Sequence, residues 1–429
     1  NVGLGEESYH LPAKSGTPVP ECNWFSKKEI TRTMSFSGET WKAEDLIFRV
    51  LSFFGSVPDP LTAKPAELKK AVRPAILVEL TFDNSKAAEP LIGFFGMQGI
   101  RRPLSDSTNR TLAGFASGTQ WGYAAFSGKD GEESMDWSVL NTGLESSPPL
   151  RKLASEGLIR WQVAPGEKKS VIVALGAFRD GIITSGFRAH AYYTVHFKDL
   201  EEVLASALED AKESIKKAEK LDEILENAKI SNERKFLIAH AAHSYNASSE
   251  LLVTESGDPL FIVNEGEYRM MNTLDLTVDQ AFWELKWSPW TVKNELDFFL
   301  SRSSYNDAYG IAFCHDQGVA DCFTPAGTSV YELPKLTGCF SYMSFEETLN
   351  WILTACLYAE STNDAEWINS KTKTFRDCLL SIIARDKNGD GILDVDSDRC
   401  SGGAEITTYD SLDISLGQAR NNLYLGVKT

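Results

Sequence analysis

The sequence changes character at residues 199–230, which read DLEEVLASALEDAKESIKKAEKLDEILENAKI. The stretch is rich in Ala, Leu, Glu and Lys, which favour helices. Its apolar residues fall on one helical stripe, as an amphipathic helix requires: Val203, Leu204, Ala207, Leu208, Ala211, Ile215 and Ala218. We therefore expect one long helix that links two domains, with its acidic residues on the solvent-exposed face.

Residues 1–198, before this helix, have the pattern of β structure. In AILVELTFDN (75–84), apolar side chains recur at every second position from Ile76 to Phe82, as one buried face of a strand requires. Two more apolar runs within residues 159–178 are joined by Pro165-Gly166, which predicts a hairpin. Short strands separated by turns rich in Gly, Asp and Asn indicate an N-terminal β-sandwich.

Residues 231–429 contain apolar runs of helical length separated by long polar loops. Ser344 and Glu347 have the spacing of a capping box at the start of one run, and Pro289 divides another into two helices. The runs occupy residues 233–252, 275–303, 344–360, 367–386 and 410–426. This order predicts an (α/α)6 barrel, of which about half is present before the sequence stops.

The expected protein is therefore a β + α multidomain chain. A β-sandwich occupies residues 1–198, a linker helix residues 199–230, and a truncated catalytic (α/α)6 barrel residues 231–429. Because the last segment stops inside a helical pattern without a cap, we expect the chain to be a fragment that lacks the C-terminal part of a longer protein.

The composition excludes several classes of function. With 60 acidic and 43 basic residues the formal net charge is -17, so the basic surface that nucleic acids require is lacking. No run approaches 18 consecutive apolar residues, so no membrane span is expected. The seven cysteines form no CxxC pair, which favours reduced thiols in a cytoplasmic protein. A leader before Asn1 stays open.

The polar loops of the helical half offer carboxylates and few other reactive groups. GxSxG, GxxxxGK[ST] and GxGxxG elements are absent, and His240 and His243 lack the HExxH spacing of zinc enzymes. Two carboxylates are sufficient for glycoside hydrolysis, because one attacks the sugar or activates water while the other protonates the leaving oxygen. The candidate loops are 264–275, 313–318, 386–398 and 402–413.

Two of these loops resemble a known family. VNEGEYRMMNTLDLTVDQ (263–280) and GGAEITTYDSLDISLGQARNNLYL (402–425) are similar to the signature segments of glycoside hydrolase family 52, the bacterial β-xylosidases, and HDQG, VADCF and PWTVKN resemble that family too. The family is related to the family 116 β-glucosidases. The resemblance implies the β-sandwich and (α/α)6 barrel. It also implies a retaining exo-β-xylosidase that cleaves xylobiose and short xylooligosaccharides in xylan degradation, needs no cofactor and favours a homodimer.

The resemblance also implies roles for individual residues. Glu265 matches the catalytic nucleophile and Asp410 matches the general acid/base. Positions that line the sugar pocket in the related family are matched by Asp275, His315, Asp316 and Thr408. Charged hydrogen bonds from such groups to sugar hydroxyls strengthen toward the transition state.

Neighbouring charges compete for these roles. Glu267 would share a face with Glu265 in an extended segment, so only the motif selects Glu265. Arg269 is expected to pair with Glu267, and both count as candidate substrate-binding residues. Asp413 competes with Asp410, but its expected place in the first turn of the next helix suits a helix-dipole role.

The loop DKNGDGILDVDSD (386–398) has the start of an EF-hand pattern. Its candidate calcium ligands are Asp386, Asn388, Asp390, the carbonyl of Ile392, and Asp394. Position 12 of the pattern is Ser397 instead of Glu, so a complete EF-hand is not expected. Two interpretations stay open, a structural calcium loop of another type and an acidic surface turn.

Three other functions stay open beside the xylosidase. The first is a β-glucosidase or mixed β-glycosidase, because the width of the pocket at the sugar C5 decides between them. The second is a non-catalytic sugar-binding protein, which would bind xylose without hydrolysing aryl xylosides. The third is a structural toroid without sugar binding.

Overall fold

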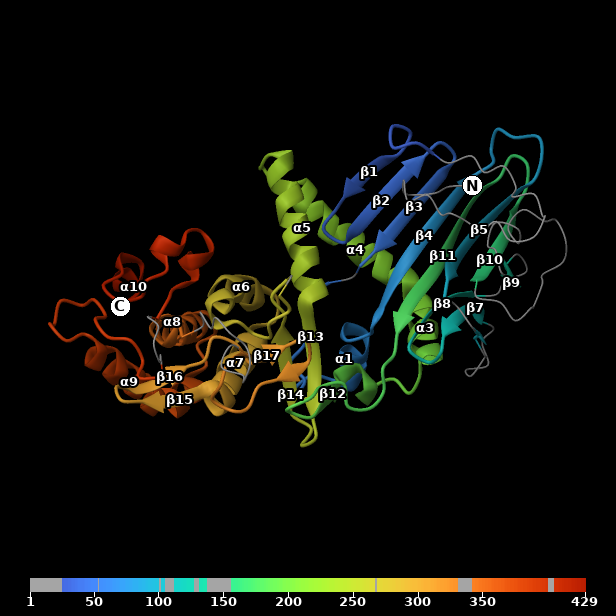
Figure 1. The fold of residues 1–429 in the computed structure, drawn as a ribbon. Coiled ribbons are helices and arrows are strands. Elements are labelled where there is room, and N and C mark those ends of the chain that lie inside the picture. The colour runs from blue at the N-terminus through green and yellow to red at the C-terminus, as the bar shows by residue number, and fades with distance from the viewer. Residues whose placement is uncertain are drawn as a thin grey trace, which may run out of the picture. The chain divides into compact units, whose positions relative to one another are not determined.

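The computed structural model describes most of the chain, which forms two compact units (Figure 1). The described residues are 25–52, 54–99, 102–104, 112–126, 131–136, 156–266, 268–330, 342–399 and 405–429, without the side chains of residues 131–136, 410, 411 and 414. The first unit comprises residues 1–54, 73–179 and 193–246; the second comprises residues 55–72, 180–192 and 247–429. Neither unit is one continuous piece of sequence, and the predicted domain boundaries at residues 198 and 230 stay predictions.

The first unit contains a large antiparallel sheet of eight strands in the order β1-β2-β3-β4-β11-β8-β7-β6. A second sheet has the order β5-β10-β9. The strands are β1 (Thr31–Met34), β2 (Gly38–Ala43), β3 (Leu46–Leu51), β4 (Ala75–Asp83), β5 (Leu91–Gln98), β6 (Arg102–Pro103), β7 (Leu112–Ser117), β8 (Trp121–Phe126), β9 (Gly131–Asp136), β10 (Glu156–Val163) and β11 (Lys168–Ala177).

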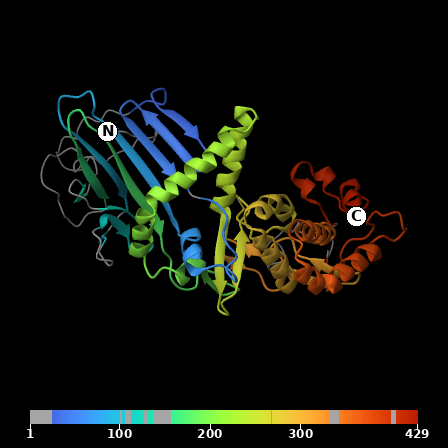
Figure 2. The same ribbon diagram turned by 180° about the vertical axis from the view of Figure 1, so that it is seen from behind.

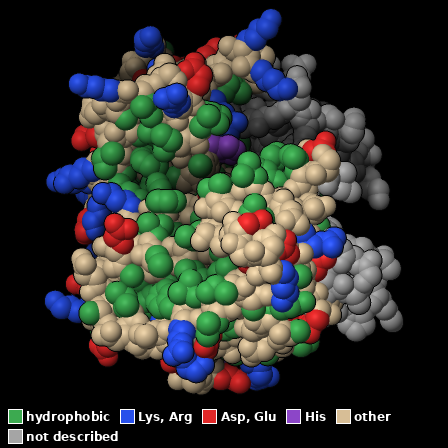
Figure 3. Space-filling view, turned by 90° about the vertical axis from the view of Figure 1, so that its left-hand side faces the viewer, with side chains coloured by type: hydrophobic (Ala, Val, Ile, Leu, Met, Phe, Trp, Pro, Cys, Tyr) green, Lys and Arg blue, Asp and Glu red, His purple; other side chains and the backbone are tan. Residues whose placement is uncertain are grey.

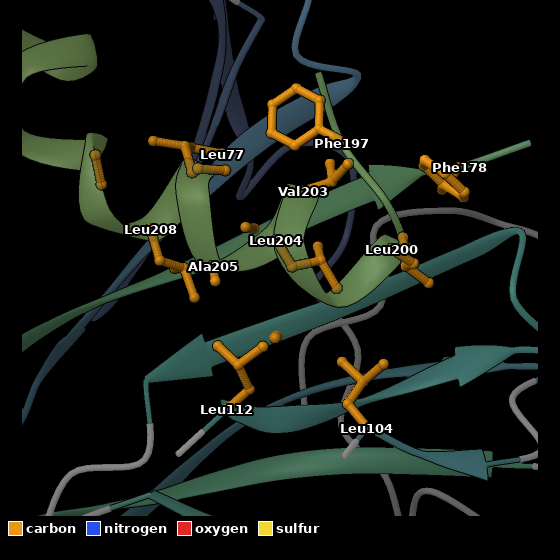
Figure 4. Packing of buried hydrophobic residues seen from close by; sticks show 14 of the residues in the cluster. Leu77, Leu104, Leu112, Phe178, Phe197, Leu200, Val203, Leu204, Ala205 and Leu208 are labelled. Atoms are coloured by element: carbon orange, nitrogen blue, oxygen red, sulfur yellow. The ribbon is translucent and has the colours of Figure 1, made fainter. Parts of the chain in front are cut away.

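Alternation along β4 sends its side chains into two different cores. Val78, Leu80 and Phe82 pack with Trp161 of β10, between the two sheets, which confirms the buried face that the sequence predicted. Leu77 lies on the opposite face, where it packs with helix α3 (Figure 4). Since side chains of a strand alternate between its faces, one run of apolar residues supports both layers.

The stretch 199–230 forms two helices, α3 (Leu200–Glu209) and α4 (Ala211–Glu226), so the prediction of one long helix is wrong. Figure 2 shows this green helical stretch in front of the blue strands of the first unit. Asp199 caps α3 by accepting the N–H of Glu202 at 2.8 Å. The helices separate at Asp210, where Arg73 donates to the Asp210 carboxylate and to the carbonyl of Ser206, both at 3.0 Å. A tertiary contact therefore interrupts a segment that local propensity makes continuous. Helix α5 (Asn232–Ser248) follows.

The Pro165-Gly166 turn joins the two sheets instead of closing a hairpin. β10 pairs with β5 and β9, whereas β11 pairs with β4 and β8. The side-chain amide of Asn84 fixes the turn by donating to the carbonyls of Val163 at 3.2 Å and Ala164 at 3.1 Å. Gly166 has a φ of 82°, which glycine adopts without strain. The predicted hairpin is wrong because a turn sequence sets a reversal of direction and does not choose the pairing partners.

The second unit contains a sheet of order β12-β13-β14 and a group of packed helices. Helices α6 (Leu274–Trp287) and α7 (Pro289–Phe298) divide at Pro289, as predicted, and α8 (Ser344–Thr362) and α9 (Ala365–Arg385) follow. Their shared core includes Leu274, Ala281, Val292, Leu296, Trp351, Ala355, Trp367 and Cys378. The other elements are α1 (Pro65–Ala71), β12 (Ala189–Ala191), η1 (Tyr192–Val195, which extends into the first unit), β13 (Ser249–Thr254), β14 (Pro259–Val263), η2 (Phe299–Ser303), β15 (Ser304–Asp307), β16 (Gly310–Phe313), β17 (Gly318–Val319), β18 (Cys322–Phe323), η4 (Thr408–Ser411), η5 (Ile414–Leu416) and α10 (Leu423–Lys428).

Hydrophobic side chains also lie on the surface of the second unit, seen from the side where α9 and α10 lie in Figure 1 (Figure 3). Exposed apolar residues of its helices include Phe282, Ile383 and Val427. Large exposed apolar patches are uncommon on monomeric soluble proteins, so the apolar surface of the second unit is a candidate contact surface. Across the described ranges, no helix is both long and apolar enough to cross a bilayer.

Candidate functional site

A tight loop at the end of β14 holds Glu265. Asn264 forms a bridge with Met271, the N–H of Glu265 donates to the carbonyl of Met270 at 2.7 Å, and the N–H of Arg269 donates to the carbonyl of Glu265 at 2.6 Å. Arg269 has a φ of 55°, a left-handed conformation that is uncommon for non-glycine residues. The loop therefore folds back on itself and fixes the backbone of Glu265, whose side chain is half-buried.

Asp275, in the first turn of α6, joins two segments that are far apart in the sequence. Its Oδ2 accepts a hydrogen bond from Thr408 Oγ1 at 2.9 Å, across 133 residues of sequence. Its Oδ1 lies 3.6 Å from His315 Nε2. Thr408 begins η4, the short 3₁₀ helix that contains Asp410. The segments of Glu265 and Asp410, predicted to form one site, thus share a direct contact.

His315 is held between two acidic residues. Its Nδ1 donates to Asp316 Oδ2 at 3.1 Å. Asp316 is fully buried, and its Oδ1 also accepts the N–H groups of Gly318 and Val330, both at 3.0 Å. These bonds fix the Asp316 carboxylate, which in turn orients the imidazole ring.

The charges around His315 favour its protonated form. Burial lowers the pKa of His315, but the hydrogen bond to Asp316 and the negative charges of Asp275, Asp316 and Glu347 raise it to about 10. His315 is therefore an imidazolium at neutral pH, and it supplies positive charge to a group of carboxyls.

Glu265 belongs to the same electrostatic group. Burial raises the pKa of Glu265, the charges of Asp275 and Asp316 raise it further, and the positive charge of His315 opposes them. Four of the residues singled out in the sequence, Glu265, Asp275, His315 and Asp316, thus influence one another, and Thr408 contacts the group through Asp275.

Residues next to Asp410 make hydrogen bonds that hold η4 in place. Thr407 precedes η4, and its side chain accepts the N–H of Tyr409 at 3.3 Å. Asp410 lies in η4, two residues after Thr408; its side chain lies outside the described part of the structure. Asp413 precedes η5 and accepts the N–H of Ser415 at 2.9 Å. The expected place of Asp413 in the first turn of a helix over residues 410–426 is therefore wrong, because this stretch forms η4, η5 and α10 and Asp413 lies before η5.

Glu347, whose side chain is fully buried in the first turn of α8, was not recognised as a site residue from the sequence. The structure begins α8 at Ser344 with Met343 as N-cap and no side-chain cap, so the predicted capping box is wrong. Ser344 Oγ is instead hydrogen-bonded to Tyr305 Oη. Glu347 Oε2 accepts from Asn350 at 3.1 Å, while Oε1 is buried without a hydrogen-bond partner.

Burial, reinforced by the charge of Asp275, raises the pKa of Glu347 well above its usual value. Donor atoms of Asp275, His315 and Glu347 lie within 4.8 Å of one another, a separation at which three ligands can share a cation. Histidine binds a metal in its neutral form, so the raised pKa of His315 opposes metal binding at these three groups.

The expected pair of Arg269 and Glu267 is not tested, because Glu267 lies outside the described residues. The charge of Arg269 acts on Glu250 of β13: burial and Asp321 raise the pKa of Glu250, and Asn264 and Arg269 oppose that shift. Arg269 also accepts the N–H of Ala320 at its carbonyl, at 2.9 Å. In the structure it supports the loop next to Glu265.

The acidic loop 386–394 closes onto its own backbone. Asp386 accepts the N–H groups of Gly389 at 2.7 Å and Gly391 at 2.8 Å. The other side-chain oxygens also accept backbone N–H groups of the loop: Asn388 from Asp390, Asp390 from Ile392, and Asp394 from Lys387. Beyond it, the N–H of Ser397 donates to the buried carboxyl of Glu405 at 2.9 Å. The loop is thus connected to the segment that leads to Asp410.

One family model matches most of the chain. The model of glycosyl hydrolase family 52 matches residues 5–358. Two proteins named beta-xylosidase from Geobacillus stearothermophilus are similar: one is 41% identical over 440 residues, covering 97% of this chain and 61% of that protein, and the other is 36% identical over 447 residues, covering 99% and 71%. The chain thus spans about 61% of the length of the first relative.

Among solved structures, a putative kojibiose phosphorylase from human microbiome is 10% identical, with a TM-score of 0.33, and the match covers 83% of this chain and 46% of that one. This likeness is too weak to support an argument about fold or function. The match to the family model extends over most of the sequence, and the two xylosidases align along nearly all of it. The chain therefore belongs to glycosyl hydrolase family 52.

Proposed function

We propose that this chain provides the catalytic residues of a retaining exo-β-xylosidase that removes xylose from the non-reducing end of xylobiose and short xylooligosaccharides. The observation that carries the proposal is the hydrogen bond from Thr408 to Asp275. It joins the loop of Glu265 to the helix of Asp410, so two carboxyl-bearing segments meet at one group of polar side chains. The choice of xylose as the sugar rests on family membership and on the names of the two relatives.

In the proposed reaction Glu265 attacks the anomeric carbon while Asp410 protonates the departing glycosidic oxygen. The bond from the anomeric carbon to that oxygen breaks, and an ester bond to Glu265 forms. A water molecule then gives a proton to Asp410 and attacks the anomeric carbon, which releases xylose and restores both carboxyls. This double displacement requires the carboxyl groups to lie about 5–5.5 Å apart.

His315 has a clear electrostatic part in this scheme. A nucleophilic carboxylate must be ionised, but burial and the neighbouring acids raise the pKa of Glu265. The imidazolium of His315 opposes that rise, so it keeps Glu265 reactive to lower pH. Asp316 acts through His315, because its own oxygens are engaged by His315 and by backbone N–H groups.

Asp275 is the residue best suited to bind a sugar hydroxyl. Its Oδ2 is engaged by Thr408, while Oδ1 forms only the ion pair with His315 at 3.6 Å and has no hydrogen-bond partner. A buried acceptor without a hydrogen bond costs free energy, and a hydrogen bond from a sugar hydroxyl to Oδ1 would reduce that cost. Asp275, His315 and Thr408 would thus bind the ring, while Glu265 and Asp410 carry out the reaction.

The finer architecture is part of the proposal. The two sheets of the first unit share a core, which supports a β-sandwich. Helices α6 to α9 pack successively around one core, which supports their membership of an (α/α)6 barrel. A structural calcium ion in the loop 386–394 is proposed as well, supported by the spacing of its oxygen ligands.

Hydrolysis of aryl β-xylosides, followed by NMR of the first sugar released, tests the function. A retaining xylosidase releases β-xylose first, and α-xylose would contradict the mechanism. Faster hydrolysis of the matching aryl β-glucoside would favour a β-glucosidase. Xylose binding without any turnover would favour a non-catalytic sugar-binding protein.

A further inference from the structure

A second acidic residue at the start of α8, Glu346, makes contacts that its neighbour Glu347 does not. Its side chain is fully buried. Oε2 accepts the backbone N–H of Thr408 at 2.9 Å, and Oε1 accepts from Tyr424 Oη at 2.6 Å and from Lys428 Nζ at 3.3 Å. One carboxylate thus connects three elements of the second unit: α8, η4 and α10.

The α10 side of this connection has its own support. Lys428 Nζ also donates to Asn350 Oδ1 at 2.7 Å and contacts Tyr424 Oη. The ring of Tyr424 packs edge-on against Tyr409 of η4, with 4.6 Å between the ring centroids and 86° between the planes. Tyr424 therefore contacts η4 through its ring and reaches it again through Glu346.

These contacts matter because η4 is only four residues long. A 3₁₀ helix of this length has little stability of its own, so its position depends on what it touches. Thr408 is bonded through its side chain to Asp275 and through its backbone to Glu346, and Tyr409 packs on Tyr424. Asp410 is the next residue in the chain.

We infer that Glu346 and Tyr424 are positioning residues that hold η4, and hence the general acid/base Asp410, in register with the Glu265 side of the site. The inference rests on the proposed function. Neither residue needs to touch the substrate. Their loss would displace the acid/base relative to the leaving oxygen, and a displacement of about 1 Å can reduce a rate by about 100-fold.

The discriminating measurement is the dependence of kcat/KM on the leaving group. Acidic phenols leave an aryl β-xyloside with little help from a general acid. Weakly acidic phenols leave only when Asp410 supplies a proton. In Tyr424→Phe and Glu346→Gln we expect kcat/KM to fall about 10- to 100-fold for poor leaving groups and by less than about 3-fold for good ones. Tyr424→Phe keeps the ring and should fold.

The chain contains a matched control in Tyr358→Phe. Tyr358 Oη donates to Asp364 Oδ2 at 2.9 Å, and Lys293 Nζ lies 3.0 Å from the same oxygen. This Tyr–carboxylate–Lys group has the same chemistry as the group at Glu346, and among the described residues its hydrogen bonds do not reach η4. Tyr358→Phe should leave the leaving-group dependence unchanged, whatever it does to stability.

A failure of the positioning role can be distinguished from a failure of the proposed function. If the parent chain hydrolyses aryl β-xylosides but Tyr424→Phe loses activity equally for all leaving groups, or loses none, the positioning role is refuted. The same refutation follows if Tyr358→Phe steepens the dependence as much as Tyr424→Phe does. If the parent chain hydrolyses no aryl β-xyloside, the proposed function itself fails, and the inference fails with it.

Discussion

The buried carboxyl of Glu405 should make the free energy of unfolding depend on pH. A single substitution at Glu405 should remove this part of the pH dependence. Burial raises the pKa of Glu405 from 4.5 to about 7, although Arg385 and the N–H groups of Ser397 and Phe345 oppose the shift. Glu405 links the segment that leads to Asp410 with the first turn of α8 and with the loop that ends at Ser397. Its protonation state therefore bears on the candidate site.

The sign and size of the effect follow from linkage. Between pH 4.5 and about 7 the unfolded chain has released the Glu405 proton while the folded chain keeps it. Unfolding is then increasingly favoured as pH rises. At 1.36 kcal/mol per pKa unit, the contribution of Glu405 to the free energy of unfolding falls by roughly 3 kcal/mol across that window. Stability is retained below the window and lost as pH rises through it.

The substitution Glu405→Gln removes this titration. Gln keeps one acceptor and loses the other, which adds a cost that does not depend on pH. We therefore compare the free energies of unfolding of parent and variant by urea denaturation at pH 4.0 and pH 8.0. The advantage of the parent over Glu405→Gln should be smaller at pH 8.0 by roughly 3 kcal/mol. An advantage that is equal at both pH values, or larger at pH 8.0, would refute the reasoning.

Three further outcomes are expected. Thr408→Val removes the hydroxyl bonded to Asp275; loss of a hydrogen bond to a charged group, about 1.5–3 kcal/mol, should lower kcat/KM for aryl β-xylosides about 10- to 100-fold. Thr362→Val, which removes a helical side-chain bond elsewhere, should leave kcat/KM near that of the parent. In His315→Asn the acidic limb of the kcat/KM profile should move to higher pH, because the positive charge that lowers the pKa of Glu265 is gone; a limb that stays in place would contradict the assigned role. Calcium at about 100 times its Kd should stabilise the chain by about 2.7 kcal/mol, and this should appear as a rise in Tm that Asp390→Ala abolishes. An equal Tm in calcium and in EDTA would contradict the proposed calcium site.

The parts of the fold that depend on local pattern could be predicted from the sequence. Alternation along β4 identified its buried face, and Pro289 marked the division between α6 and α7. The interrupted helix at Asp210 and the partners of β10 and β11 could not be predicted. Both depend on distant residues, Arg73 in one case and Asn84 in the other, and no local pattern contains that information.

The candidate site, too, could be predicted only in part from the sequence. The motifs around Glu265 and Asp410 identified the two segments, and the structure joins them through Thr408 and Asp275. Glu346 and Glu347 were missed because acidic residues in the first turn of a helix usually lie in solvent and complement its dipole. Only the fold shows that both are buried and face the site from α8.

The central claim is that Glu265 attacks the anomeric carbon of a β-xyloside. Inactivation with a 2-fluoro-xyloside that carries a good leaving group, followed by peptide mass spectrometry, tests it directly, because the glycosyl-enzyme then accumulates on the nucleophile. We predict one fluoroxylosyl group per chain, on Glu265. A label on Glu267 or on another residue, or inactivation without a covalent label, would contradict the account.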